Sequence, residues 1–147
     1  MSTLFGKLPW VARLLAGFIF ALFGLNGFLQ FLPMPPPQGQ AAQFLGGLAA
    51  AGYFYPLLAL TELVAGVLLL AGRFVPLALL LLAPVIVNVV GFHLSIAPAG
   101  LPLAFLVLAL ELYLAWAYRD SFAPVLRARA IPVSTEVVEP IKRGAVA

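Results

Sequence analysis

The sequence predicts an all-α fold, an integral membrane bundle of four transmembrane helices, and three observations lead to it. The chain of 147 residues is 64% hydrophobic and only 9% charged, and its mean hydropathy is +1.12. One soluble core of this size cannot bury so many apolar side chains. Four apolar runs are long enough to cross a bilayer. If the chain crosses the membrane at each of them, every basic residue lies on the same side of it.

The first predicted span covers residues 9–32. A helix over this run crosses about 30 Å of hydrocarbon at about 1.5 Å per residue. The run lacks the short apolar core and the small-residue cleavage site of a secretory signal peptide, so we expect it to be retained. The other predicted spans cover residues 55–72, 74–95 and 101–119, and we assign residues 1–126 to one transmembrane domain.

Glycine and proline support the limits of these spans. Gly72 is placed to end the second helix, while Pro76 and Pro102 fall near the first turns of the next two, where a missing N–H costs little. Pro84 lies inside the third run and frees one backbone carbonyl there. We therefore expect the third helix to be kinked, with a polar neighbour for that carbonyl.

Two segments lie outside the spans. Between the first two spans, a proline cluster is followed by a stretch rich in Ala and Leu, which predicts a short interfacial helix. The last residues, 127–147, mix charges and prolines without helical periodicity, so we expect a mobile cytoplasmic tail.

The basic residues predict the orientation of the chain. They flank the apolar runs instead of forming a patch, which argues against a nucleic-acid partner and for a topological role. Because cytoplasmic segments carry the excess of Lys and Arg, we expect both termini in the cytoplasm, at the inner membrane of a bacterium. The basic residues are Lys7, Arg13, Arg73, Arg119, Arg127, Arg129, Lys142 and Arg143.

Four polar side chains fall at similar depth in the outer half of the predicted bundle. At about 1.5 Å per residue, Asn26 and Glu62 lie about 9 Å below the outer surface, Asn88 about 13 Å and His93 about 6 Å. Hydrocarbon cannot satisfy an amide, a carboxyl or an imidazole, so each of these groups needs a protein partner or a wet cavity. The common depth predicts a polar pocket, with Glu62 and His93 as a close pair and Asn88 turned toward Asn26 or the carbonyl freed by Pro84.

Each polar residue also has a structural interpretation. Asn26 and Asn88 are candidates for hydrogen bonds that only hold helices together. For Glu62 the alternative to a ligand or proton-relay role is a packing residue, and for His93 it is a hydrogen bond to a loop carbonyl. Glu111 on the fourth span is expected to form a structural ion pair with Arg13, whose side chain can reach inward.

Several classes of function are excluded by missing motifs. The chain has no cysteine, so thiolate metal sites and dithiol redox chemistry are excluded. A single histidine excludes haem with two His ligands, and no short His/acid spacing indicates a metal site. There is no glycine-rich phosphate loop and no Ser-His-Asp set. We find no self-contained catalytic machinery, and whether the protein is part of an enzyme is left open.

Three stretches resemble the DoxX family of small bacterial four-helix membrane proteins, over roughly residues 11–126. They are "RLLAGFIFALFGLNGFLQF", "TELVAGVLLLAGRFVPLALLLLAP" and "NVVGFHLSIAPAGLPLA". The more specific features are Glu62, the Gly-Arg turn that follows its helix, and His93 near the end of the third span. The family takes its name from a membrane subunit associated with quinone-linked sulfur oxidation, and relatives are linked to oxidoreductase complexes.

The resemblance implies an accessory subunit of a redox-linked, quinone-associated membrane complex. In such a subunit, Glu62 and His93 would hydrogen-bond the carbonyls of a quinone head group or relay protons, and a redox partner protein would supply the electrons. No covalently bound cofactor is expected, and a homo-oligomer is left open. The alternative is a non-catalytic membrane factor or carrier that binds a small lipid or a polar solute.

Overall fold

The computed structural model describes residues 7–129 of the chain, and this part is helical with no strand. Within it, four helices are long and apolar enough to cross a membrane. The predicted four-helix membrane bundle is therefore confirmed. In chain order the elements are α2 (Leu8–Leu29), α3 (Gly39–Ala50), α4 (Phe54–Ala71), α5 (Val75–Ser95), the short 3₁₀ helix η1 (Pro98–Gly100), α6 (Leu101–Ala117) and α7 (Arg119–Phe122).

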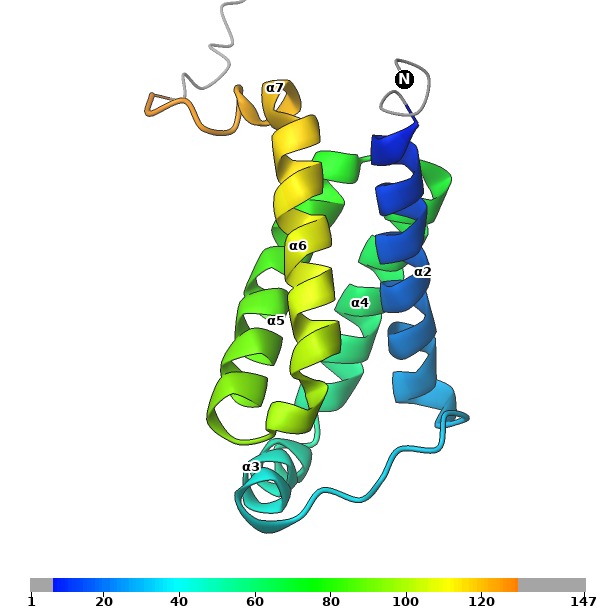
Figure 1. Ribbon diagram of the computed structural model, residues 1–147, viewed down its shortest axis with the longest axis vertical. Helices are drawn as coiled ribbons and strands as arrows, with labels where there is room; N and C mark the ends of the chain where they lie inside the picture. Colours follow the sequence, from blue (N-terminus) through cyan, green and yellow to red (C-terminus); the bar gives the residue numbers. More distant parts are fainter. Residues whose placement is uncertain (1–6, 130–147) are drawn as a thin grey trace, which may run out of the picture.

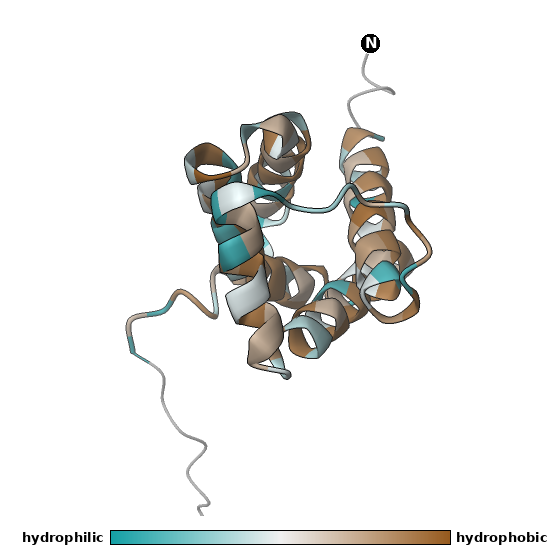
Figure 2. Ribbon diagram, turned by 90° about the horizontal axis from the view of Figure 1, so that it is seen from below, coloured by the Kyte–Doolittle hydropathy of each residue, from teal (hydrophilic) through white to brown (hydrophobic). Residues whose placement is uncertain are grey.

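The long helices α2, α4, α5 and α6 lie lengthwise beside one another, and α3 lies across one end of the bundle (Figure 1). The start of α2, the turn between α4 and α5, and α7 all lie at the opposite end. Seen from the α3 end, the long helices are mostly hydrophobic, while hydrophilic residues show on α3 and the segment before it (Figure 2). The tail beyond Arg129, including Lys142 and Arg143, lies outside the described residues.

Helix α2 ends at Leu29, three residues before the predicted limit. The next residue, Gln30, adopts a left-handed conformation with φ 50°, and its backbone N–H donates to the Asn26 carbonyl. The Asn26 side chain then accepts a hydrogen bond of 2.7 Å from the backbone N–H of Leu32. Asn26 was predicted to face a pocket, but its side chain instead stabilises the turn that follows the end of its own helix.

Close packing between α2 and α4 depends on small residues. A Cβ atom built on Gly17 would lie 2.9 Å from the Leu70 backbone nitrogen, and one on Gly27 would lie 2.5 Å from the Ala59 Cβ. Cβ atoms on Gly24 and Gly66 would overlap the backbone of the facing helix outright. The two backbones approach so closely because these side chains are absent, as in other membrane helix pairs.

Arg13 of α2 binds the C-terminal end of α4. Its guanidinium donates a hydrogen bond of 2.7 Å to the Leu69 carbonyl and packs against Gly72, whose left-handed conformation (φ 67°) ends α4. The predicted ion pair with Glu111 is not formed: within residues 7–129 the one ion pair joins Arg119 to Asp120. Both Arg13 and Glu111 are 8% exposed, but Arg13 satisfies a helix C-terminus, which favours positive charge.

The buried core lies mainly in the half of the bundle that holds the start of α2. It contains Ala12 and Ala16 of α2, Leu69 of α4, Leu79 of α5 and Leu114 of α6, and it continues onto Phe122. These residues come from the first turns of α2 and α5 and the last turns of α4 and α6. The other half of the bundle, near α3, holds fewer of the fully buried side chains.

Candidate functional site

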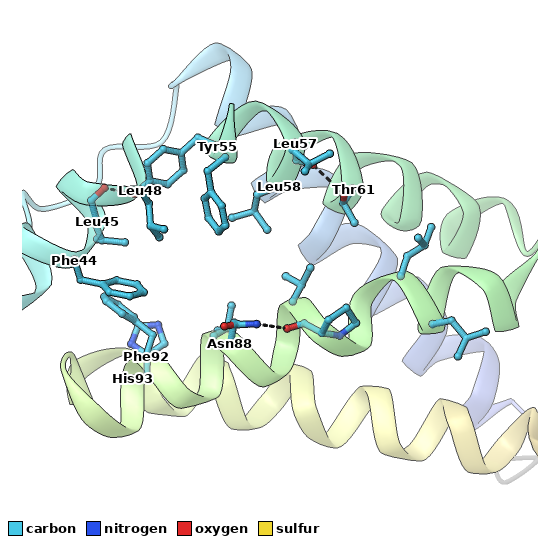
Figure 3. Close-up of a pocket in the computed structure, with 16 residues that line it drawn as sticks. Phe44, Leu45, Leu48, Tyr55, Leu57, Leu58, Thr61, Asn88, Phe92 and His93 are labelled. Carbon is cyan, nitrogen blue, oxygen red and sulfur yellow. Dashed lines mark hydrogen bonds between the residues drawn. The ribbon is translucent and has the colours of Figure 1, made fainter. Parts of the chain in front are cut away.

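A cavity of about 560 Å³ lies between α4 and α5 and reaches α3 at the end of the bundle (Figure 3). Most of its wall is made of Leu, Phe and Val side chains from these three helices. Two lining residues, Leu57 and Leu80, are 57% and 46% exposed. The cavity therefore communicates with the outer, lipid-facing surface of the bundle.

The first polar group of the cavity wall is Asn88, which lies one turn after Pro84 on α5. Helix α5 continues through Pro84 to Ser95 without interruption. The Asn88 side chain donates a hydrogen bond of 2.8 Å from Nδ2 to the carbonyl of Pro84 itself (Figure 3). The sequence predicts a bond to the carbonyl that Pro84 frees, which belongs to the residue four positions earlier, or a contact with Asn26. The observed bond is neither of these. Asn88 lines the cavity, and no residue among 7–129 donates a hydrogen bond to its Oδ1, so this oxygen is free to accept one.

His93 lies at the end of the cavity near α3, where α5 ends. Its Nδ1 is 2.7 Å from the carbonyl oxygen of Ala97, and its ring meets Phe92 edge-on with centroids 5.1 Å apart. Gly100 leaves room for the imidazole, because a Cβ atom there would overlap the ring. The loop after α5 thus fixes the ring orientation, and the bond to a loop carbonyl that sequence reasoning held open is present.

Helix α3 covers the end of the cavity through two contacts. The Tyr55 hydroxyl donates a hydrogen bond of 3.1 Å to the Leu45 carbonyl, and the rings of Phe44 and Phe92 lie 5.6 Å apart. No residue of α3 is buried. Its first residue, Gly39, and Gly52, which follows its end, have positive φ angles of 57° and 72°. Helix α3 is therefore attached lightly to the bundle.

A fourth polar side chain, Thr61, lies deeper along α4. Its hydroxyl donates a hydrogen bond of 2.9 Å to the Leu57 carbonyl one turn earlier, a common arrangement for threonine in a helix. Thr61 also lines the cavity. Together with Tyr55, it gives α4 two hydroxyl groups on the wall.

The structure brings together only part of the predicted polar layer. Asn88 and His93 both line the cavity, whereas Glu62 and Asn26 do not. Among the described residues, no hydrogen bond or ion pair joins Glu62 to His93, so the predicted close pair is not formed. Glu62 is half-buried on α4, next to Thr61 in sequence and therefore about 100° away from it around the helix.

Sequence reasoning missed the contributions of α3 and of the α4 hydroxyls. Tyr55 was given no role in the site, and the Ala/Leu-rich stretch that forms α3 was interpreted only as an interfacial helix. The signal for both was present, because an aromatic residue with a hydroxyl at a helix start beside a short apolar helix favours a contact between the two. Nothing in the sequence around Thr61 indicates a role other than that of a residue in its helix.

Comparison of the chain with protein-family models, curated proteins and solved structures finds no match. A mostly apolar cavity that opens toward lipid and carries a few fixed polar groups suits an amphipathic small molecule.

Proposed function

We propose that the protein binds an apolar small molecule of the quinone class in the cavity between α4 and α5, as a DoxX-like accessory subunit of a redox-linked membrane complex. The observation that carries the proposal is the cavity itself. Its volume, about 560 Å³, falls within the range of about 300–1,000 Å³ usual for small-molecule sites. The polar side chains Asn88 and His93 would meet the head group, and the exposed side near Leu57 and Leu80 would let an isoprenoid tail pass into the lipid.

A partner protein must supply the electrons in this proposal. The chain has no cysteine, and none of the polar side chains on the cavity wall transfers electrons by itself. The role left to this subunit is to hold and orient the quinone at the edge of the bilayer. The resemblance to the DoxX family supports this role.

The second candidate is a lipid carrier or membrane factor without redox partners. It is favoured by the open side of the cavity, which would admit an acyl chain as readily as an isoprenoid tail. The two candidates differ in what the purified protein retains. Mass spectrometry of organic extracts should find a quinone for the first candidate, and a phospholipid or fatty acid without quinone for the second.

A pair of valines on α5 tests occupancy of the cavity. Val89 lines the cavity, whereas Val87 is 67% exposed and is not part of its wall. Val89→Phe should fill the cavity and reduce the amount of co-purified quinone at least tenfold, while Val87→Phe should leave it unchanged. Equal retention by both variants would contradict binding in this cavity.

The proposed orientation places the start of α2, the turn between α4 and α5, and α7 on the cytoplasmic side of a bacterial inner membrane. The support is the concentration of basic residues at this end. Since the chain lacks cysteine, Gln38→Cys and Ser121→Cys provide clean labelling sites. An impermeant thiol reagent added to intact cells should label the first and spare the second, and the opposite pattern would reverse the orientation.

A further inference from the structure

The polar side chains of the cavity share one property: each donates a hydrogen to a backbone carbonyl. The acceptors are the carbonyls of Leu45, Leu57, Pro84 and Ala97, at 2.7–3.1 Å. A carbonyl oxygen can only accept, so in every case the hydrogen belongs to the side chain. The side chains are Tyr55, Thr61, Asn88 and His93.

The hydrogens and lone pairs that these bonds do not use are available to a ligand. A hydroxyl has a single hydrogen, so the hydroxyls of Tyr55 and Thr61 keep only lone pairs free. A neutral imidazole has one N–H, and in His93 it is Nδ1, which leaves Nε2 as an acceptor. Asn88 keeps its Oδ1 and one N–H. The cavity therefore offers acceptors from four side chains and a donor from only one.

We infer that this cavity selects ligands by their hydrogen-bond donors, and that it takes a phenolic hydroxyl, as in a quinol, in preference to the carbonyls of a quinone. The inference rests on the proposed function for the class of ligand but adds its protonation and reduction state. It also revises the sequence-based expectation that His93 would donate to a quinone carbonyl. An O–H group placed on Nε2 would be paired, whereas a carbonyl there would face a lone pair and leave both groups unsatisfied.

The shape of the site agrees with a ring-bearing ligand. Nε2 belongs to an imidazole that is fixed by the Ala97 carbonyl and Gly100, and Phe92 stands edge-on to it. The ring of Phe44 lies 5.6 Å from that of Phe92 at an angle of 30°. Phe92 thus lies beside the imidazole that carries the acceptor, and Phe44 lies beside Phe92, so the ring of a ligand that carries the hydroxyl would meet aromatic side chains.

A set of redox-inert probes tests the preference directly. The purified full-length protein in detergent is titrated by calorimetry with 4-nonylphenol, its methyl ether and nonylbenzene. The three share the alkyl chain and the ring, but only the phenol carries a donor. We expect the phenol to bind at least about tenfold more tightly than either other probe, which corresponds to about 1.4 kcal/mol.

The substitution His93→Phe identifies the acceptor. Phenylalanine retains an aromatic ring beside Phe92 and Gly100 but removes both nitrogens, so the preference for the phenol should fall at least threefold while nonylbenzene binds as before. Thr61→Val, in which the replaced hydroxyl is a weaker acceptor away from the aromatic rings, is the matched comparison and should keep most of the preference. Should His93→Phe fail to fold, the ratio of affinities in the native protein decides alone.

The outcomes separate this inference from the proposed function. Equal affinities for the phenol, the ether and nonylbenzene would overturn the donor preference and leave the cavity as an apolar binding site. Binding of none of the three probes would overturn both the preference and the proposed small-molecule site.

Discussion

The two sides of α4 are packed in opposite ways. Toward α2, the glycines Gly17, Gly24 and Gly66 let the two backbones touch, so that an added methyl group has no room. Toward α5, large side chains such as Phe54 and Leu58 hold the helices apart around a cavity of about 560 Å³. A single helix thus serves as half of a rigid pair and as one wall of a binding site.

This contrast explains how a bundle of four helices can contain a cavity and still fold. In a membrane, water does not drive helices together, so contact between helices must come from close packing and hydrogen bonds. The glycine-rich side supplies that contact, and Arg13 adds a hydrogen bond to the Leu69 carbonyl at the end of the pair. The side toward α5 is thereby freed from the need to pack tightly.

The largest expected effect comes from breaking the glycine-rich side. Gly66→Val should destabilise the protein by about 3 kcal/mol, because the Cβ atom would overlap the backbone of Ala21. Gly91→Val is the control, since a Cβ atom there meets nothing within 4 Å. The measurement is unfolding in detergent followed by circular dichroism, and equal stability of the two variants would refute the importance of this interface.

A smaller effect is expected from Arg13→Met, which keeps much of the packing volume but removes the donor to the Leu69 carbonyl. The Leu69 carbonyl keeps its hydrogen bond from the backbone N–H of Gly72, so the cost is that of one hydrogen bond from a charged group. The free energy of unfolding should fall by about 1.5–3 kcal/mol. Lys7→Met, at an exposed position at the start of α2, should change it by less than about 0.5 kcal/mol. If Arg13 acted through Glu111 instead, Glu111→Gln would destabilise the protein as much as Arg13→Met does.

The smallest effect is expected on the open side. Tyr55→Phe removes the hydrogen bond to the Leu45 carbonyl and should change global stability by no more than about 1 kcal/mol. Its consequence is local: backbone amides of α3 should exchange with deuterium faster, while those of α2 stay protected. Unchanged exchange in α3 would show that this hydrogen bond does not hold the helix in place.

The sequence allowed the helices to be predicted because their signals are local. Apolar runs, a glycine after α4 and prolines near the starts of α5 and α6 are all visible along the chain. The short helix α3 was also predicted, from its Ala and Leu content. Depth in the membrane follows from counting residues, and Asn88 and His93 do lie on one cavity wall.

The partners of the polar residues could not be predicted, because depth does not give direction around a helix axis. Glu62 shares the predicted level of His93 but is not part of the cavity wall. Asn26 finds its partner in the loop that follows its own helix, and Arg13 finds its partner in a backbone carbonyl. When the rotation of each helix about its axis is unknown, the sequence does not show whether a polar side chain will bond to another side chain or to the backbone.

The unequal lengths of the helices have a consequence for the surrounding membrane. Helix α2 has 22 residues and α4 only 18, so at about 1.5 Å per residue they span about 33 Å and about 27 Å. A hydrocarbon layer of about 30 Å exceeds the shorter helix, and lipids beside it must tilt or compress to cover its ends. The bilayer should therefore be thinner next to α4 than next to α2, which brings the head-group region toward the cavity.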